Sequence, residues 1–206
     1  MLEFAERNAN ESGSAAGARV VGTIGRVLTL RVDLPAALSQ TRAQTAAPMT
    51  SGWLTASPEG AHRLERVQLM PTGTELEACG RELLAWGLHR RAGLRVLAEG
   101  DAALGVNVVL EAKFGPVSAV APCRVTALVE GAERVGFEYA TLPGHPELGV
   151  ERFEFVRDAL GVRFEVRAVS KPAFVGSRAL PFLARRVQER ITHRYLEAAL
   201  AVAGGD

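Results

Sequence analysis

The 206-residue sequence is poor in the residue types that identify a particular chemistry. It has two cysteines, two tyrosines and two tryptophans, and its only lysines are Lys113 and Lys171. Cys79 and Cys123 lie far apart and form no CxxC or Cys/His group, which argues against a disulfide framework or a zinc site. The formal net charge is +1, so the composition does not indicate nucleic acid as a partner.

Long apolar runs are also absent. None approaches the roughly 20 residues that cross a bilayer. The N-terminus has Glu3 and Glu6 where a signal peptide would be basic, and no apolar segment follows them. We therefore expect a cytoplasmic protein without a membrane span. Its arginine-, alanine- and glycine-rich composition is typical of a GC-rich bacterial genome.

The motifs that bind cofactors and metals are missing as well. The sequence contains no GxGxxG or Walker-type loop. The four histidines show no HxH or HExxH spacing: His62, His89, His145 and His193. Ser170 and Cys123 lack the sequence context of a covalent nucleophile. We therefore expect neither a cofactor nor a metal ion.

What is present predicts one folded domain. Hydrophobic residues make up 48% of the chain, enough for a sizeable core. Residues 1–18 are small, polar and aperiodic, which predicts a disordered tail, and no boundary divides residues 19–206. Alternating apolar residues predict a strand over 26–32. Residues 36–62 are interpreted as an irregular connection with a short helix near 36–43.

A second helix is predicted from Thr74 to Gly93. Thr74 and Glu77 match a capping box, and Gly93 follows a basic last turn. Beyond it the pattern changes to short strands separated by turn residues, at 94–98, 107–114, 120–129, 135–141, 150–156 and 162–169. Such close turns favour an antiparallel meander, because parallel crossovers need a dozen residues or more.

The last predicted element is a long amphipathic helix over 178–202. Its apolar stripe consists of Leu183, Val187, Ile191, Tyr195 and Val202. Arginines on the opposite face alternate with Glu189 and Glu197, as on a solvated face. The sequence thus predicts an α+β fold, a curved antiparallel sheet wrapped on a long C-terminal helix.

Several segments resemble a known family. Residues 139–151, Tyr-Ala-Thr-Leu-Pro-Gly-His-Pro-Glu-Leu-Gly-Val-Glu, resemble the Tyr-Gly-Thr-Leu-Pro-Gly-His-Pro signature of the domain-of-unknown-function 1990 family. Residues 86–93, 122–125 and 164–172 are similar to further blocks of that family, and the resemblance covers about 67–200. Ala140 stands where glycine is usual, and Val150 where the family often has the first of two glutamates. The family has no assigned function, so the resemblance implies relatives without implying chemistry.

The order of elements also looks like the helix-grip fold of the START and Bet v 1-like superfamily. That resemblance implies a cavity for hydrophobic ligands between the sheet and the C-terminal helix. Aromatic residues alternate along the predicted strands and could line the cavity or form ordinary core: Phe137, Tyr139, Phe153 and Phe164. Arg124 and His145 are the candidate polar anchors, although Arg124 would equally suit a cross-strand pair with Glu138 or Glu151.

Three classes of function stay open at this point. The favoured hypothesis is a noncatalytic protein, monomer or homodimer, that binds a small hydrophobic or amphipathic ligand. The alternative is an enzyme in which the rigid loop holds His145 as a general acid/base with Glu151 or Glu147. The same loop residues are also typical of a stiff hairpin turn without a catalytic role. The third is a protein-interaction module that docks a partner on an edge strand or on the C-terminal helix.

Overall fold

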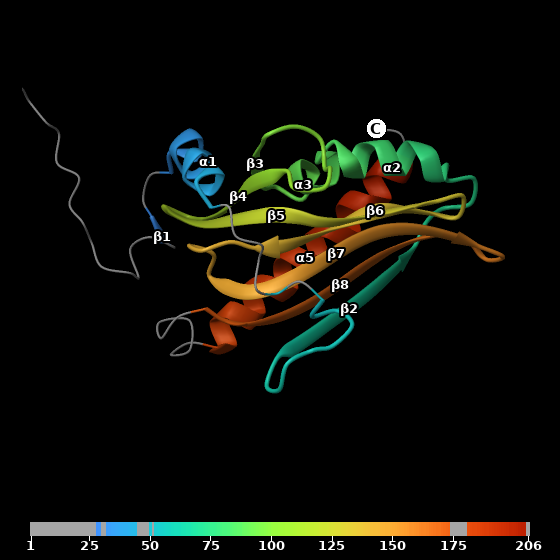
Figure 1. The fold of residues 1–206 in the computed structure, drawn as a ribbon. Coiled ribbons are helices and arrows are strands. Elements are labelled where there is room, and N and C mark those ends of the chain that lie inside the picture. The colour runs from blue at the N-terminus through green and yellow to red at the C-terminus, as the bar shows by residue number, and fades with distance from the viewer. Residues whose placement is uncertain (1–27, 30–31, 45–49, 51, 174–180, 205–206) are drawn as a thin grey trace, which may run out of the picture.

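The computed structural model describes residues 28–29, 32–44, 50, 52–173 and 181–204 (Figure 1). The predicted tail, most of the predicted first strand and the start of the last helix lie outside the described residues. The described helices are α1 (Leu34–Arg42), α2 (Leu76–Leu84), α3 (Gly87–Arg91) and α5 (Pro181–Gly204). The strands are β1 (Leu28–Thr29), β2 (His62–Leu69), β3 (Arg95–Ala98), β4 (Asn107–Phe114), β5 (Val117–Gly131), β6 (Arg134–Thr141), β7 (Glu147–Asp158) and β8 (Gly161–Pro172).

The sheet is the predicted antiparallel meander. Seven strands follow the order β2-β8-β7-β6-β5-β4-β3, and β1 pairs with the part of β5 that extends beyond β6. A bulge between Val125 and Ala127 interrupts the β5–β6 register, and bulges of this kind bend and twist a strand. The sheet curves over α5, which runs behind it in Figure 1. The predicted fold class is therefore confirmed.

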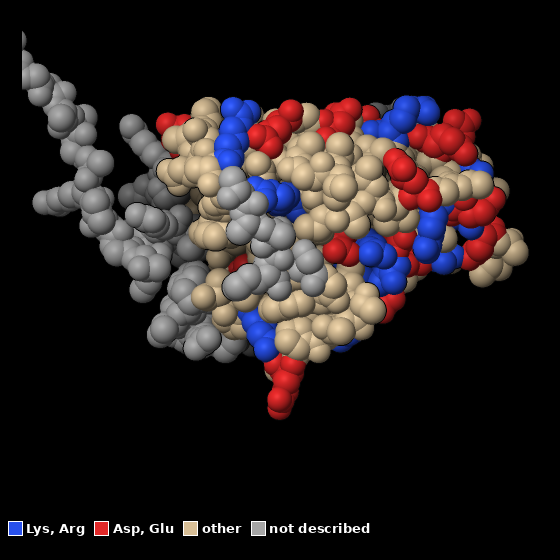
Figure 2. Space-filling view, in the orientation of Figure 1, with Lys and Arg blue, Asp and Glu red and all other residues tan. Residues whose placement is uncertain are grey.

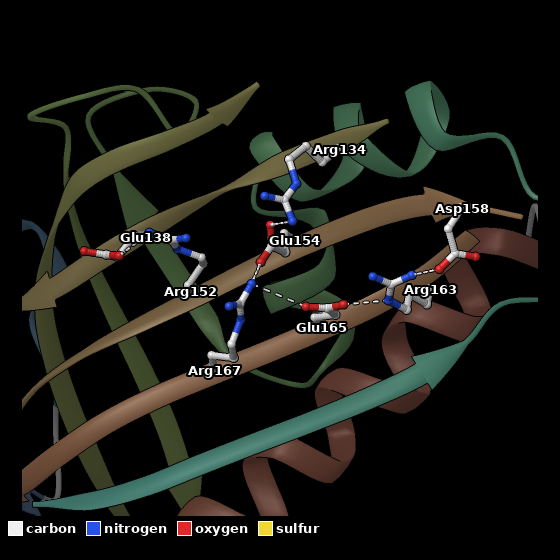
Figure 3. Close-up of polar contacts among 8 residues, drawn as sticks. All are labelled: Arg134, Glu138, Arg152, Glu154, Asp158, Arg163, Glu165 and Arg167. Atoms are coloured by element: carbon white, nitrogen blue, oxygen red, sulfur yellow. Dashed lines mark hydrogen bonds and ion pairs between the residues drawn. The ribbon is translucent and has the colours of Figure 1, made fainter. Parts of the chain in front are cut away.

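The two faces of the sheet have different chemistry. The inner face carries the core, in which apolar side chains of β4–β8 pack against α2, α3 and the second half of α5. On that helix Tyr195, Ala198 and Ala199 are buried, whereas Arg190, His193 and Glu197 are exposed as predicted. The outer face of β6–β8 carries arginines and carboxylates in ion pairs (Figure 3). Figure 2 shows that positive and negative side chains lie side by side there.

Three details differ from the sequence-based expectations. The strand β2 was not predicted from the sequence. On this edge strand Leu64 is buried while Val67 and Leu69 are exposed, so its apolar residues do not alternate with polar ones in the way that indicates a strand. The capping box is wrong: Glu75 is the N-cap residue of α2 and caps with its backbone only, while the Thr74 hydroxyl donates to the carbonyl of Pro71. The helix predicted over 74–93 is broken at Trp86.

The break has a local cause in backbone conformation. Trp86 adopts a left-handed conformation with φ of 62°, which ends α2 and starts α3 in a new direction. Its indole is buried and donates from Nε1 to the carbonyl of Gly100 at 2.9 Å. A left-handed non-glycine residue is costly and persists only where the surroundings fix it. As a result Leu88 and His89 also point into the core.

Gly136 allows β6 and β7 to approach closely. A Cβ at this position would overlap the carbonyl oxygen of Phe153 and lie 2.7 Å from the Cα of Glu154. We expect Gly136→Ala to lower the free energy of unfolding by about 2 kcal/mol, because the backbone must shift to make room. Urea unfolding measures the effect, with Gly131→Ala as control, since the nearest atom to a Cβ there is the Arg134 side chain at 3.4 Å. Equal losses in the two variants would contradict this account.

Candidate ligand site on the inner face of the sheet

An aromatic cluster occupies the centre of the inner face. Phe137, Phe153 and Phe164 are fully buried, and Tyr139 is nearly so. The ring centroids of Tyr139 and Phe153 are 5.5 Å apart, and those of Phe153 and Phe164 are 6.5 Å apart. The structure thus brings together the four aromatic residues predicted from the sequence. The Phe153 ring contacts the other three rings and that of Tyr195, which closes the cluster from α5.

A polar group borders this cluster at the end where β7 begins. The Tyr139 hydroxyl donates to Oε2 of Glu151 at 2.8 Å and is hydrogen-bonded to the Tyr195 hydroxyl. Burial raises the pKa of Glu151 from 4.5 to about 7; the Tyr139 hydrogen bond opposes this shift and the charge of Glu147 adds to it. Burial likewise raises the pKa of Glu147, whose side chain is hydrogen-bonded to Ser170. A carboxyl group that gains or loses its proton near neutral pH therefore lies against an apolar surface.

His145 lies in the β6–β7 loop, two residues before Glu147. Its backbone N–H donates to the carbonyl of Leu142 at 3.1 Å, and its Nδ1 accepts from the backbone N–H of Glu147 at 2.9 Å. The imidazole therefore caps the turn, and its proton lies on Nε2. Burial lowers the pKa of His145 to about 4. The ring is neutral near pH 7, where its Nε2–H can donate one hydrogen bond but the ring carries no charge.

Arg124 does not share the site with the other predicted residues. It alternates along β5 with Cys123 and Val125, which belong to the inner core, and it pairs across the strands with Asn107. Its Nε donates to Oδ1 of Asn107 at 2.8 Å, and its guanidinium also donates to the carbonyl of Gln44. Arg124 therefore lies on the outer face, and placing it beside His145 at the mouth of a cavity requires correction.

The carboxylates considered as partners of Arg124 are engaged elsewhere. Glu138 accepts from Arg152 at 2.9 Å and from Thr126 at 3.1 Å. Glu151 accepts from Tyr139 on the inner face. The parity of β5 decides which face Arg124 occupies, and the sequence left that parity open.

The structure adds His89 to the site. The side chain is fully buried, and neither ring nitrogen has a hydrogen-bond partner. Its ring centroid lies 4.8 Å from that of Phe153, 5.1 Å from that of Tyr195 and 6.1 Å from that of Tyr139. Burial, and then the charge of Arg90, lower the pKa of His89 to about 3. A buried neutral imidazole without a partner is uncommon and calls for a physical explanation.

Sequence reasoning missed His89 for an identifiable reason. It was assigned to the basic last turn of one continuous helix, and the left-handed Trp86 changes which face of that segment meets the core. Tyr195 was predicted as a core residue of the last helix, but its hydroxyl was not connected with Glu151 because the two residues are far apart in the sequence. Neither role has a local signal.

Other sites have little support in the described part of the chain. There, no three His, Cys, Asp or Glu side chains are arranged to hold a metal ion. No helix among the described residues combines the length and apolar character needed to cross a membrane. A surface hollow of about 480 Å³ lies beside α1 and β3, lined by residues that include Leu34, Arg90 and Leu97. No member of the aromatic cluster lines this hollow.

The similarity of this chain to known sequences agrees with the signature in the β6–β7 region. A family model described as Domain of unknown function (DUF1990) matches residues 45–198, well over half of the chain. The chain belongs to this family. A UPF0548 protein of Deinococcus radiodurans is 37% identical over 109 residues, which are 48% of this chain and 55% of that protein. The match thus spans about half the length of the curated relative.

Solved structures show the fold to which this DUF1990 member belongs. The hypothetical protein jhp0584 from Helicobacter pylori has a TM-score of 0.57 at 9% identity, covering 77% of this chain and 96% of its own. The di-domain ARO/CYC BexL from the BE-7585A biosynthetic pathway has a TM-score of 0.55 at 12% identity, covering 84% of this chain and 59% of its own. The di-domain ARO/CYC StfQ from the steffimycin biosynthetic pathway has a TM-score of 0.51 at 16% identity, covering 70% of this chain and 51% of its own. These matches confirm the helix-grip architecture and, at such low identity, show the fold alone.

The two departures from the DUF1990 signature lie opposite each other. Ala140 and Val150 are cross-strand partners in the β6–β7 pair, and both are buried. The residue after Val150, Glu151, alternates to the inner face, where Tyr139 binds it. The departures therefore leave the polar group of the inner face intact.

Proposed function

We propose that this protein binds a small hydrophobic or amphipathic molecule between the inner face of the sheet and α5. One observation carries the proposal: the apolar inner face ends in a single convergent polar group, formed by Tyr139, Glu151 and Tyr195. Sites for small molecules are mostly apolar and contain a few precisely placed polar groups that fix the orientation of the ligand. The helix-grip fold supports the same proposal.

In this arrangement the two parts of the ligand would be recognised separately. The rings of Phe153 and Phe164 offer apolar surface, and each Å² of such surface removed from water contributes about 25 cal/mol. Tyr139 and Glu151 would orient a polar head, since an unpaired polar group in an apolar site costs more than a hydrogen bond gains. Because the rings are packed against one another, entry of a ligand would require α5 to move relative to the sheet.

A second candidate function has an observation of its own. Glu151, with a pKa of about 7, has the proton affinity that suits a general acid/base at neutral pH. His145, with a pKa of about 4, would be neutral and could only assist by hydrogen bonding. An enzyme in this site would therefore use Glu151 rather than His145 as its proton-transfer group, with Tyr139 positioning it.

Native mass spectrometry of protein purified from its own host tests the binding proposal. We expect a reproducible small apolar adduct, and we expect Tyr139→Phe to reduce its occupancy because the variant removes the hydroxyl that orients Glu151. Glu154→Gln is the matched control, since this carboxylate lies on the outer face of the same strand as Glu151. The neutral fluorescent probe N-phenyl-1-naphthylamine provides a second assay. A clean apo mass together with no probe binding would overturn the proposal.

A further inference from the structure

The carboxylates on the two faces of the sheet differ in their partners. On the outer face every glutamate of β6–β8 has an arginine partner: Glu138 with Arg152 at 2.9 Å, Glu165 with Arg163 at 2.6 Å, and Glu154 with Arg134 at 3.4 Å and with Arg167. Figure 3 shows a linked series from Arg134 through Glu154, Arg167 and Glu165 to Arg163, with the Glu138–Arg152 pair separate from it. A buried carboxylate is normally paired in this way, because an uncompensated charge is costly.

Among the residues that the structure describes, the inner-face carboxylates have no such partners. Within the described residues, no Arg, Lys or His side chain forms an ion pair with Glu147 or Glu151. Their described side-chain partners are neutral hydroxyl groups, those of Ser170 and Tyr139. Two neighbouring, partly buried carboxylates on the inner face therefore receive no compensating positive charge from the described residues.

A second and independent observation comes from the opposite side of the same group. His89 is fully buried with neither nitrogen paired, and its ring packs against Tyr139 and Tyr195, the two tyrosines linked to Glu151. One nitrogen of a neutral imidazole is a hydrogen-bond acceptor. The other nitrogen carries the proton and also lacks a partner, so His89 adds one unpaired acceptor and one unpaired donor beside the polar group. A ligand that brings an N–H donor would satisfy the acceptor.

We infer that the polar head of the ligand is an ammonium group, so that the protein binds an amphipathic amine. This inference rests on the proposed function of the site. The ammonium lies between Glu147 and Glu151 and supplies the positive charge that these carboxylates do not receive from the described residues. The aromatic rings of Tyr139 and Tyr195 add cation–π attraction, which reaches about 2 kcal/mol in desolvated sites. The apolar part of the amine lies along the phenylalanine rings.

The same geometry discriminates against other head groups. A carboxylate or phosphate head would meet two like charges, which costs several kcal/mol at close range. A hydroxyl head could donate to Glu151 but would leave the charge of the pair uncompensated. The order of affinity expected for ligands of equal chain length is therefore amine, then alcohol, then carboxylate.

Competition against N-phenyl-1-naphthylamine tests this order with octylamine, 1-octanol and octanoate. At pH 8 we expect octylamine to bind about tenfold more tightly than 1-octanol, and octanoate not to compete. The double variant Glu147→Gln/Glu151→Gln should retain the probe and lose the preference for octylamine. The outer-face variant Glu154→Gln should keep the preference, which separates a local effect from a change in total charge.

The pH dependence gives a further readout. Glu151 is faced by Glu147 from β7, Tyr139 from β6, Cys123 from β5 and Tyr195 from α5. The tyrosines and Cys123 have pKa values raised by burial and stay neutral below pH 8. Protonation of the two carboxyl groups therefore sets the change, and the preference for octylamine should shrink between pH 8 and pH 5.5.

The outcomes distinguish the inference from the function on which it rests. Equal competition by the three ligands, or tightest binding of 1-octanol or octanoate, would overturn the amine assignment while binding itself stands. Failure of the probe and of all three ligands to bind would overturn the proposed function. A preference for octylamine that persists in the double variant would show that residues other than Glu147 and Glu151 bind the ammonium group. That result would also overturn the inference.

Discussion

We expect the difference in free energy of unfolding between Glu151→Gln and the wild type to be about 3 kcal/mol more in favour of the variant at pH 8 than at pH 4. The magnitude follows from the rise in the pKa of Glu151 from 4.5 to about 7, since each pKa unit corresponds to about 1.36 kcal/mol. Glutamine has nearly the same shape and keeps an oxygen that can accept from Tyr139. The variant therefore removes the charge and preserves the hydrogen bond.

The sign follows from proton binding in the two states. Between pH 4.5 and pH 7 the folded protein holds a proton on Glu151 that the unfolded chain has released. The wild type thus loses stability as pH rises through this window, whereas the glutamine variant has no such loss. The difference should be constant above about pH 8 and below about pH 4.

Urea unfolding of both proteins at a series of pH values measures this difference. Glu77→Gln is the control, because a hydrogen bond to its own backbone and then Arg157 lower the pKa of Glu77. Glu77 therefore contributes stability that is lost on acidification, and its variant should show a pH trend of opposite sign. A difference between Glu151→Gln and wild type that does not change with pH would refute the account of the inner face.

Much of the fold could be predicted because its signals are local. The strand β4 has the predicted bounds 107–114, and the predicted strands over 120–129, 135–141, 150–156 and 162–169 lie within β5 to β8. The hairpin turns between them contain glycine, proline or aspartate, which the sequence displays directly. The helix α1 also occurs where a short helix was predicted.

The candidate site depended on facts that are not local. Which face Arg124 occupies is set by the parity of β5 and its register with β4, and shifting either by one residue would exchange the faces. The contacts of His89 depend on the left-handed Trp86, which no pattern of apolar residues indicates. The aromatic residues were found because alternation alone places Phe137 and Tyr139 on the same face.

His89 contributes the second large effect, and it has the opposite pH dependence. We expect the difference in free energy of unfolding between His89→Leu and the wild type to shift in favour of the variant as pH falls below 6.5. At pH 4 this difference should be about 3 kcal/mol more favourable to the variant than at pH 7. The pKa of His89 is lowered from 6.5 to about 3, so in this window the unfolded chain binds a proton that the folded protein does not. The wild type therefore loses stability on acidification, and the leucine variant lacks this loss.

Urea unfolding at pH 4 to 7 measures the effect, and His89→Phe provides a second variant that keeps a planar ring in the aromatic cluster. Both variants should show the same dependence on pH even if their packing differs, because the linkage depends only on loss of the titrating group. A pH-independent difference in both variants would show that His89 becomes protonated in the folded protein and therefore has a partner there.

These two variants also separate stability from binding. An imidazole with two unpaired nitrogens in an aromatic core costs about 1–3 kcal/mol for each desolvated group. If that cost is retained because a ligand supplies the missing partner, the leucine and phenylalanine variants should be stable and bind octylamine less tightly. Unchanged binding in both would mean that the ligand does not reach His89, and Glu147 and Glu151 would then hold the ammonium head by themselves.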